Sequence, residues 1–225
     1  MTAEDVAAKA SGLLMRWRSD LLHAARLGPV LDVACGDGRN GLALALADRL
    51  GGENSRPADV SGLGDAVDAP ASQALGSDER PWSSEVLPEV LLVDRSAEGI
   101  KGLVRSGLPQ NAAFRLMDLE TPEPPSFGVD AFGVVLVFRY LHRPLVPVLR
   151  ACLAPGGMLV YETYLEGQEA YGKPRNPDHL LRRGELVAWF GDWEVLELYE
   201  GELAAPPRVM GRVVCRKPGA THFGK

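Results

Sequence analysis

Cysteine is scarce in this 225-residue sequence, and its three cysteines lie far apart. Their number is odd and low, so we expect no disulfide framework, and Cys35, Cys152 and Cys215 do not have the close spacing of metal ligands, so we expect no metal site. The sequence also lacks a run of about 18 apolar residues, the length of a membrane span, and an apolar core of signal-peptide length near its N-terminus. These absences favour a cytoplasmic protein with no membrane association.

The sequence also has almost no net charge outside residues 51–88. The net charge is −6, but residues 51–88 contribute −5 of it and the remaining residues only −1. A nucleic-acid-binding protein usually presents a strongly basic surface, so we expect a small-molecule partner and no nucleic acid. The composition does not indicate an oligomeric state.

Residues 51–88 differ in composition from the rest of the chain. They hold six serines, five glycines and four prolines, together with seven acidic residues. A polar segment of this kind has too few apolar side chains to order itself by burial. We expect an acidic insertion that is disordered or loosely docked, the alternative being a lid anchored by Trp82. The chain as a whole, residues 1–225, is then a single domain that begins with a helical segment over residues 1–27.

Outside the insertion, short apolar runs alternate with helical patterns. This alternation predicts a parallel α/β sheet covered by helices on both faces. Residues 193–201 and 207–217 are separated by only a short loop, which predicts a closing antiparallel pair. The other expected strands are 29–35, 90–94, 112–118, 131–138 and 157–164, and the expected helices are 3–27, 39–50, 96–105 (capped by Ser96), 144–153 and 185–190.

The stretch VLDVACGDGRNGLALALA, residues 30–47, joins the first of these strands to a helix through Gly36-x-Gly38-x-x-Gly41. This spacing is the dinucleotide fingerprint, so an NAD(P)-dependent oxidoreductase is one interpretation. Asp37, however, would place a carboxylate beside the pyrophosphate that such a ligand sets at the helix N-terminus. Asp32 and Asp37 better suit a ligand with a positive centre and no phosphate. S-adenosylmethionine is such a ligand.

Three acidic residues end three successive strands. Asp32 belongs to the first, and Asp94 ends the second, where a carboxylate can hold a ribose diol. Asp118 ends the third, where it could accept a hydrogen bond from an adenine amino group. Each also has a structural interpretation, in a loop, a helix cap or a turn. The carboxyl ends of parallel strands meet at one edge of a sheet, so we favour a shared nucleoside site.

These motifs resemble a known superfamily. LDVACGDG is similar to the first motif of class I S-adenosylmethionine-dependent methyltransferases, VDRS and MDLE stand in the places of the second and third, and LAPGGMLVYET resembles the turn into their fifth strand. Within the superfamily, GDGRNGLALA and GELVAWF resemble the tellurite-resistance and thiopurine methyltransferase-like group, which acts on small molecules. The insertion and the run FRYLHRP depart from that group.

The resemblance implies a fold and a cofactor site. The fold is a three-layer sandwich with a seven-stranded, mostly parallel, Rossmann-like sheet in the order 3-2-1-4-5-7-6, with strand seven antiparallel. The cofactor is S-adenosyl-L-methionine. Its expected binding residues are Asp32, Gly36, Asp37, Gly38, Asn40, Asp94, Arg95, Asp118, Leu119 and Phe138.

The catalytic candidates follow the fourth and fifth expected strands; they are His142, Arg139, Glu162 and Tyr161. His142 is the best base by its ordinary pKa, although it could instead brace its loop. Arg139 and Arg143 could hold an anionic substrate or pair with Glu162, and pairing is the favoured interpretation because an unpaired buried carboxylate is costly. The turn-rich loop over residues 165–186 is expected to pass over the acceptor.

The sequence is therefore interpreted as a methyltransferase that moves a methyl group from S-adenosylmethionine to a small-molecule acceptor. A carboxylate or another oxyanion is among the candidate acceptors. The alternatives are a non-catalytic, regulatory S-adenosylmethionine-binding protein and the NAD(P)-dependent oxidoreductase.

Overall fold

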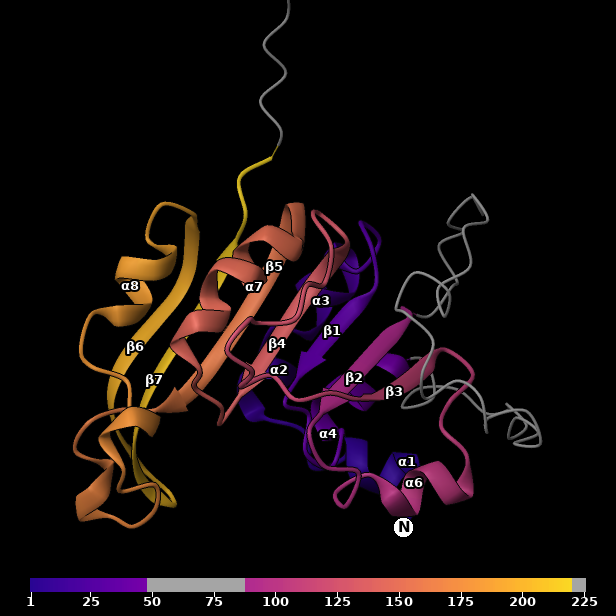
Figure 1. Cartoon of the computed structure of the whole chain (residues 1–225), viewed down its shortest axis with the longest axis horizontal. Helices are drawn as coiled ribbons and strands as arrows, with labels where there is room; N and C mark the ends of the chain where they lie inside the picture. Colours follow the sequence, from indigo (N-terminus) through magenta and orange to yellow (C-terminus); the bar gives the residue numbers. More distant parts are fainter. Residues whose placement is uncertain (48–87, 220–225) are drawn as a thin grey trace, which may run out of the picture.

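A computed structural model describes residues 1–47 and 88–219 of the chain, so almost all of the expected insertion lies outside the described residues. The strands form one sheet in the order β3-β2-β1-β4-β5-β7-β6 (Figure 1). All neighbouring strands run parallel except β7, which is antiparallel to both β5 and β6. The predicted strand order is confirmed. The strands are β1 Val30–Val33, β2 Val90–Asp94, β3 Ala112–Leu116, β4 Phe132–Phe138, β5 Leu153–Tyr164, β6 Glu194–Ala204 and β7 Pro207–Arg216.

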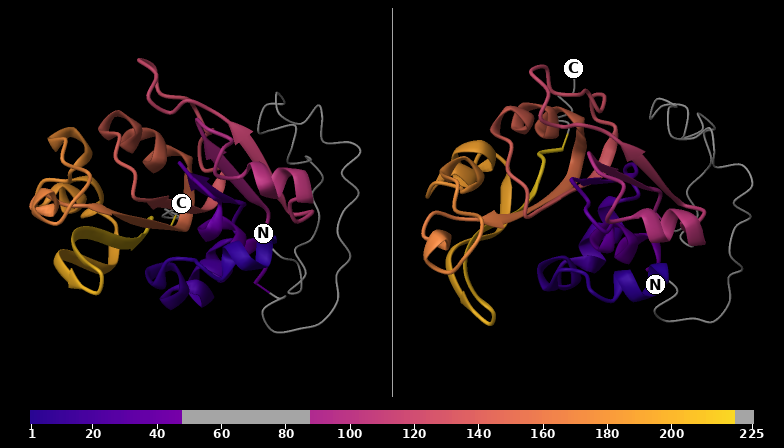
Figure 2. Two further views of the ribbon diagram at one scale, coloured as in Figure 1. Left: turned by 90° about the horizontal axis from the view of Figure 1, so that it is seen from below. Right: turned by 60° about the horizontal axis from the view of Figure 1, so that its bottom comes forward.

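Helices cover both faces of the sheet, as the two turned views show (Figure 2). One face carries α7 (Val146–Cys152) and α8 (Glu185–Phe190). The other carries the N-terminal helices together with α4 and α6; these are α1 Ala3–Ala7, α2 Gly12–Arg16, α3 Arg18–Ala24, α4 Arg39–Ala45 and α6 Lys101–Ser106. Short 3₁₀ turns lie at Arg143–Leu145, Gln168–Ala170 and Pro177–His179. In the described part of the chain, no helix combines the length and apolar character needed to cross a bilayer.

The central strands are buried on both faces, which explains their continuous apolar runs. All four residues of β1 are buried, and so are the first six of β4. Successive side chains point to opposite faces, so Leu31 and Val33 pack toward α7 and α8 while Val30 packs toward the N-terminal helices. Asp32 shares the face of Val30. The same alternation places Glu162 of β5 on the N-terminal-helix face, in register with Phe138 at the end of β4.

Several expected element boundaries were wrong. The pattern over residues 3–27 forms three helices rather than one, because Ser11 caps α2 by accepting a hydrogen bond from the Leu13 amide and the chain breaks again at Trp17. Ser96 does not cap a helix. Its amide donates to Asp94 and its hydroxyl accepts from the Glu98 amide, so local side-chain bonds form turns here and α6 starts five residues later.

Candidate functional site

The loop from β1 to α4 has an unusual backbone that fixes its shape. Gly36 and Gly38 have φ values of 60° and 73°, a region that glycine enters without steric cost. Ala34 adopts φ 52° in the same loop although it carries a Cβ, a conformation that costs an L-residue about 1 kcal/mol. At Gly41, an added Cβ would lie 2.6 Å from Leu92. The third glycine of the motif therefore serves the packing of α4 on β2.

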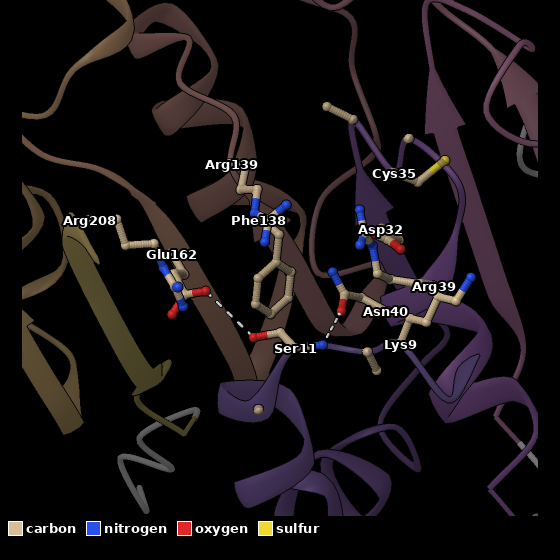
Figure 3. A pocket seen from close by; sticks show the side chains of 14 residues that line it. Lys9, Ser11, Asp32, Cys35, Arg39, Asn40, Phe138, Arg139, Glu162 and Arg208 are labelled. Carbon is tan, nitrogen blue, oxygen red and sulfur yellow. Dashed lines mark hydrogen bonds between the residues drawn. The ribbon is translucent and has the colours of Figure 1, made fainter. Parts of the chain in front are cut away.

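A cavity of about 370 Å³ opens beside this loop, at the carboxyl ends of β1 and β4. The strand order reverses between these two strands, and open α/β sheets bind ligands at such switch points. Figure 3 shows the lining side chains gathered around the ring of Phe138. They are Lys9, Ala10, Ser11, Gly12, Asp32, Ala34, Cys35, Gly36, Arg39, Asn40, Phe138, Arg139, Glu162 and Arg208.

Asp32 is the buried carboxylate of this cavity, with 1% of its surface exposed. One oxygen accepts a hydrogen bond of 2.8 Å from the Gly41 amide. Burial raises the pKa of Asp32 to about 7, and the nearby charges of Asp37 and Asp94 add to the rise, while the Gly41 amide and Arg39 oppose it. Asp32 therefore favours a cationic ligand group that would share its charge.

Residues 9–12, which connect α1 to α2 and include the first residue of α2, line the cavity, and the sequence reasoning did not anticipate them. The amide of Ser11 donates to Asn40 Oδ1 at 2.9 Å, and its hydroxyl donates to Glu162 Oε1 at 3.5 Å. Both bonds are drawn in Figure 3. We call residues 9–12 the strap. It connects α4 with β5 and contributes Lys9 to the lining. No pattern in the sequence pairs Ser11 with residues 29 and 151 positions away.

Glu162 is buried with 8% of its surface exposed, and its ionic partner is Arg212. The distance from Arg212 Nε to Glu162 Oε2 is 3.5 Å, and Arg212 Nη1 lies 3.8 Å from Glu197. The expected pairing of Glu162 with Arg139 or Arg143 was wrong. Arg212 of β7 is the register neighbour of Glu162 in the sheet and supplies the compensating charge.

Arg143 forms its ion pair with Glu185, away from Glu162. It forms two hydrogen bonds of 2.8 Å with Glu185 at the start of α8, and it also donates to the carbonyls of Asp178 and Leu180. These contacts tie the loop after β4 to the loop before α8. Arg139, with φ 55°, has no carboxylate within salt-bridge distance among residues 1–47 and 88–219.

A second, smaller cavity of about 160 Å³ lies at the carboxyl ends of β2 and β3. Ala34 lines both cavities, so the two adjoin at the glycine loop. The Asp94 carboxylate accepts hydrogen bonds of 2.9 Å from the amides of Gly36 and Ser96, which fixes the loop against β2. Asp118 accepts from the Glu120 amide and is otherwise exposed. The lining is Ala34, Asp94, Arg95, Asp118, Leu119, Glu120 and Tyr140.

Tyr140 brings an unpaired hydroxyl to the smaller cavity. Its oxygen is buried and has no hydrogen-bond partner among the described residues. Burial raises the pKa of this phenol, and the charges of Glu120 and Asp118 raise it further. The group therefore stays protonated and can donate a hydrogen bond into the cavity.

Several predicted site residues line neither cavity. Asp37 pairs with Arg39 at 2.9 Å, so its carboxylate already has a cationic partner within the protein. A Cβ added at Gly38 would lie 3.3 to 3.4 Å from Leu92, Ile100 and Leu42, so a side chain there would face the core. The expected acceptor loop, residues 165–186, is absent from the described lining of the larger cavity, whereas the strap is part of it.

Two predicted catalytic residues are likewise separate from the larger cavity. Tyr161 is 1% exposed on the opposite face of the sheet, where it packs with Trp189 and Phe190 and donates to the Tyr140 carbonyl. Odd-numbered residues of β5 at this point face α7 and α8, which explains the difference from Glu162. His142 precedes the turn at Arg143–Leu145 without capping it through its side chain, and its buried Nε2 has no partner within the described chain.

Cys35 lines the larger cavity without the features of a nucleophile. Burial raises the pKa of its thiol well above the usual value, and the Asp32 and Asp94 charges add to the rise. Reactive cysteines need a lowered pKa. Across the described ranges, no three His, Cys, Asp or Glu side chains are grouped so that they could hold a metal ion.

The sequence matches no protein-family model and no curated protein. Solved structures do match. TehB from Haemophilus influenzae is 19% identical over 88% of this chain with a TM-score of 0.54, and this chain spans 62% of the TehB chain. An S-adenosylmethionine-dependent methyltransferase from Methanosarcina mazei is 16% identical, with 85% and 92% of the two chains covered and a TM-score of 0.50.

The [4+2]-cyclase SpnF also matches, with 14% identity, 91% and 81% of the two chains covered, and a TM-score of 0.53. At these identities the likeness extends to the fold and does not distinguish the tellurite-resistance and thiopurine group from other members, so that subgroup stays a prediction. A cyclase among the neighbours also shows that the fold alone does not establish the reaction. The chain has the seven-stranded fold shared by S-adenosylmethionine-dependent methyltransferases.

Proposed function

We propose that the chain binds S-adenosylmethionine and transfers its methyl group to a small-molecule acceptor. The observation that supports this most is the joining of two cavities at Ala34. The larger one presents the buried Asp32 carboxylate, and the smaller one presents Asp94 and Asp118. A ligand with a cationic amino-acid end and a nucleoside end would place an amine near Asp32 and hydroxyl or amino donors near the other two carboxylates.

The residues present fit this cofactor. Backbone amides and a short turn allow close approach at Gly36, and Leu119 supplies a buried apolar wall for a base. Lys9 and Arg39 line the same part of the larger cavity as Asp32 (Figure 3). Arg39 is paired with Asp37, so Lys9 is the cation that can balance a ligand carboxylate. Bound S-adenosylmethionine supplies a methyl carbon on a positively charged sulfur, and that sulfur leaves as a neutral thioether when an acceptor lone pair takes the methyl group.

Glu162 replaces His142 as the candidate base. It lies in the cavity wall beside Phe138, whereas His142 is outside the lining. An acceptor hydroxyl or amine would give its proton to the Glu162 carboxylate, and the strap and Phe138 would hold the acceptor and limit the access of water. Most of the rate would then come from the positioning of the two reactants.

The acceptor is proposed to be an anion of small size. Arg39 is paired with Asp37 and Glu162 with Arg212, so the lining cations without a carboxylate partner in the described residues are Lys9, Arg139 and Arg208, against the carboxylate of Asp32. The cations therefore exceed the anions, and a neutral or cationic acceptor would leave the excess charge uncompensated.

Calorimetry tests the proposal directly. We expect the full-length chain to bind S-adenosylmethionine and S-adenosylhomocysteine, and to bind NAD⁺ and NADP⁺ at least about 100-fold more weakly. Asp118→Ala should weaken S-adenosylhomocysteine by about 1–3 kcal/mol, the cost of losing a hydrogen bond to a charged group. The matched control is Glu123→Ala, which changes an exposed acid outside both linings.

The same chain would then be incubated with S-adenosylmethionine and a metabolite extract. Formation of S-adenosylhomocysteine together with a product heavier by one methylene group supports methyl transfer. Binding of the cofactor without any turnover would instead support the regulatory alternative. Tight NAD(P) binding without S-adenosylmethionine binding would contradict the proposal.

A further inference from the structure

Charges in the larger cavity are divided by the Phe138 ring. In Figure 3, Asp32, Asn40, Arg39, Lys9 and Cys35 lie on the side of the glycine loop. Arg208 and Glu162 lie on the other side, toward β5 and β7, and Arg139 lies above the ring; these three residues form the second group. The first group faces the part of the cavity that joins the smaller cavity at Ala34. The second group therefore bounds the space left for another molecule.

The two arginines of the second group are available to a ligand. Arg208 is the second residue of β7, and its Nη1 donates a hydrogen bond to the Pro206 carbonyl at 3.2 Å. Over residues 1–47 and 88–219, neither Arg208 nor Arg139 has a carboxylate within 4.0 Å. Other arginines of this region are paired, such as Arg212 with Glu162 and Arg143 with Glu185.

Glu162 is not available to neutralise these arginines. Its Oε2 faces Arg212 and its Oε1 accepts from Ser11. Arg212 is 11% exposed in its side chain, and Glu162 is 10% exposed. The pair already balances itself within the protein, so the positive charges of Arg139 and Arg208 remain to be compensated from outside.

We propose that Arg139 and Arg208 together bind a carboxylate or comparable oxyanion of the methyl acceptor, with its hydroxyl or amine directed to Glu162. This inference rests on the proposed function, because it names the acceptor class of that site. Two planar guanidinium groups suit the two or more oxygens of such an anion. The acceptor is thus a small acid that also carries a protic nucleophile.

The transfer step balances with these groups. The acceptor oxygen or nitrogen forms a bond to the methyl carbon, and the carbon–sulfur bond breaks with its electron pair moving to sulfur. The proton lost by the acceptor passes to the Glu162 carboxylate and then to solvent. The bound anion keeps its charge throughout, so the arginine pair binds the reactant and the product equally and contributes chiefly to KM.

The test uses sulfate as the probe anion in full-length protein saturated with S-adenosylhomocysteine, at constant ionic strength set with chloride. Calorimetry should show one sulfate site. Arg208→Ala and Arg139→Ala should each weaken sulfate binding at least about tenfold, and Arg208→Lys should restore only part of the affinity because the guanidinium fork is lost. The control Arg105→Ala changes an exposed arginine on α6 and should leave sulfate binding unchanged.

A second readout separates this inference from the proposed function. S-adenosylhomocysteine affinity should change less than about threefold in Arg208→Ala, whereas Lys9→Ala should weaken it. Equal sulfate affinity in Arg208→Ala, Arg105→Ala and the unchanged protein would mean an adventitious ion only and would overturn the inference. Equal losses of sulfate and S-adenosylhomocysteine binding in Arg208→Ala would overturn it too, since the arginine would then belong to the cofactor site. Failure of the unchanged chain to bind S-adenosylhomocysteine would instead contradict the proposed function.

Discussion

Tyr161 is buried and Tyr140 is partly buried with a buried hydroxyl, and the two hydroxyls differ in one hydrogen bond. The Tyr161 hydroxyl donates to the Tyr140 carbonyl at 3.2 Å, whereas the Tyr140 hydroxyl has no partner within the described residues. A buried unpaired polar group costs about 1–3 kcal/mol. The protein without ligand therefore carries this cost at the smaller cavity, and a ligand acceptor atom that reaches the Tyr140 hydroxyl would remove it.

Replacing each tyrosine by phenylalanine separates the two roles. Tyr140→Phe should leave the melting temperature of the ligand-free protein unchanged or raised, while weakening S-adenosylhomocysteine about 2- to 10-fold. Tyr161→Phe should lower the free energy of unfolding by about 1 kcal/mol and leave the affinity nearly unchanged. Thermal unfolding and calorimetry measure both. Unchanged affinity in Tyr140→Phe would show that the hydroxyl makes no ligand contact.

Asp32 predicts a pH dependence. Its pKa in the folded protein is raised to about 7 by burial, above the ordinary carboxyl value near 4. At Asp32 the folded protein thus binds more protons than the unfolded chain between these values, so the contribution of this group to stability falls as the pH rises from about 4 through 7. A cationic ligand amine favours the ionised carboxylate, so binding should release about half a proton at pH 7.

Calorimetry in buffers of different ionisation enthalpy would measure this proton release. In Asp32→Asn the release should disappear, the cofactor should bind more weakly, and the free energy of unfolding should fall less steeply, or rise more steeply, with pH over the same window than in the unchanged protein. Proton release that persists in Asp32→Asn would assign it to another group.

The strap is the element that the sequence reasoning missed. Asn40 is buried at the start of α4 and binds the Ser11 amide through Oδ1. In Asn40→Ala, that amide loses its partner, and we expect faster hydrogen exchange at residues 9–12 and cofactor binding weaker by about 1–2 kcal/mol. Ser11→Ala is the comparison, because it keeps the amide bond and removes the longer contact to Glu162 as well as the α2 cap. Unchanged exchange in Asn40→Ala would show that other contacts hold the strap.

The part of the site formed by strand ends and the glycine motif was predictable from the sequence, whereas the strap and the partners of Glu162 were not. Strand periodicity and the glycine motif act locally, so they placed Asp94, Asp118 and Phe138 at the same sheet edge without tertiary information. The partners of Glu162 depend on register with β7, which pairs residues about 50 positions apart. The strap depends on a turn between two short helices. Neither leaves a periodic pattern in the sequence.

Strand alternation also explains the error at Tyr161. The residues Tyr161 and Glu162 are equally plausible as catalytic groups when only strand ends are considered. The sheet assigns consecutive side chains to opposite faces, and the face of Tyr161 is filled by α8. Sequence alone did not determine which of the two faces the cavity occupies.

At the scale of the molecule, each half of the sheet supplies side chains to one of the two proposed sites. β1, β2 and β3 present Asp32, the Asp94 loop and Asp118 to the cofactor site proposed above. β4, β5 and β7 present Arg139, Glu162 and Arg208 to the proposed acceptor site. The strap joins the halves through Asn40 and Glu162. Changes in one half should therefore affect the other half mainly through the strap.

The whole fold also predicts the result of removing the acidic segment. The Asn111 side-chain amide donates to the Ala45 carbonyl at 3.0 Å and to the Pro88 carbonyl at 2.8 Å. One nitrogen thus holds the chain where it leaves α4 and where it enters β2, so a short linker can connect the two points. Replacing residues 48–87 by about six glycine and serine residues, which can reach roughly 20 Å, should preserve the sheet. Shortening this loop should raise the free energy of unfolding by about 1–2 kcal/mol, because closing a loop costs less entropy when the loop is shorter.

Thermal unfolding and S-adenosylhomocysteine binding would be compared between the shortened and full chains. Both cavities are lined within residues 1–47 and 88–219, so we expect affinity within about threefold of the full chain. Asn111→Ala in the shortened chain is the control. It should cancel much of the gain in stability, since it leaves two carbonyls without their shared donor. A shortened chain that is soluble but loses cofactor affinity would show that the removed residues contribute to the site, and a lower unfolding free energy would show that they pack against the fold.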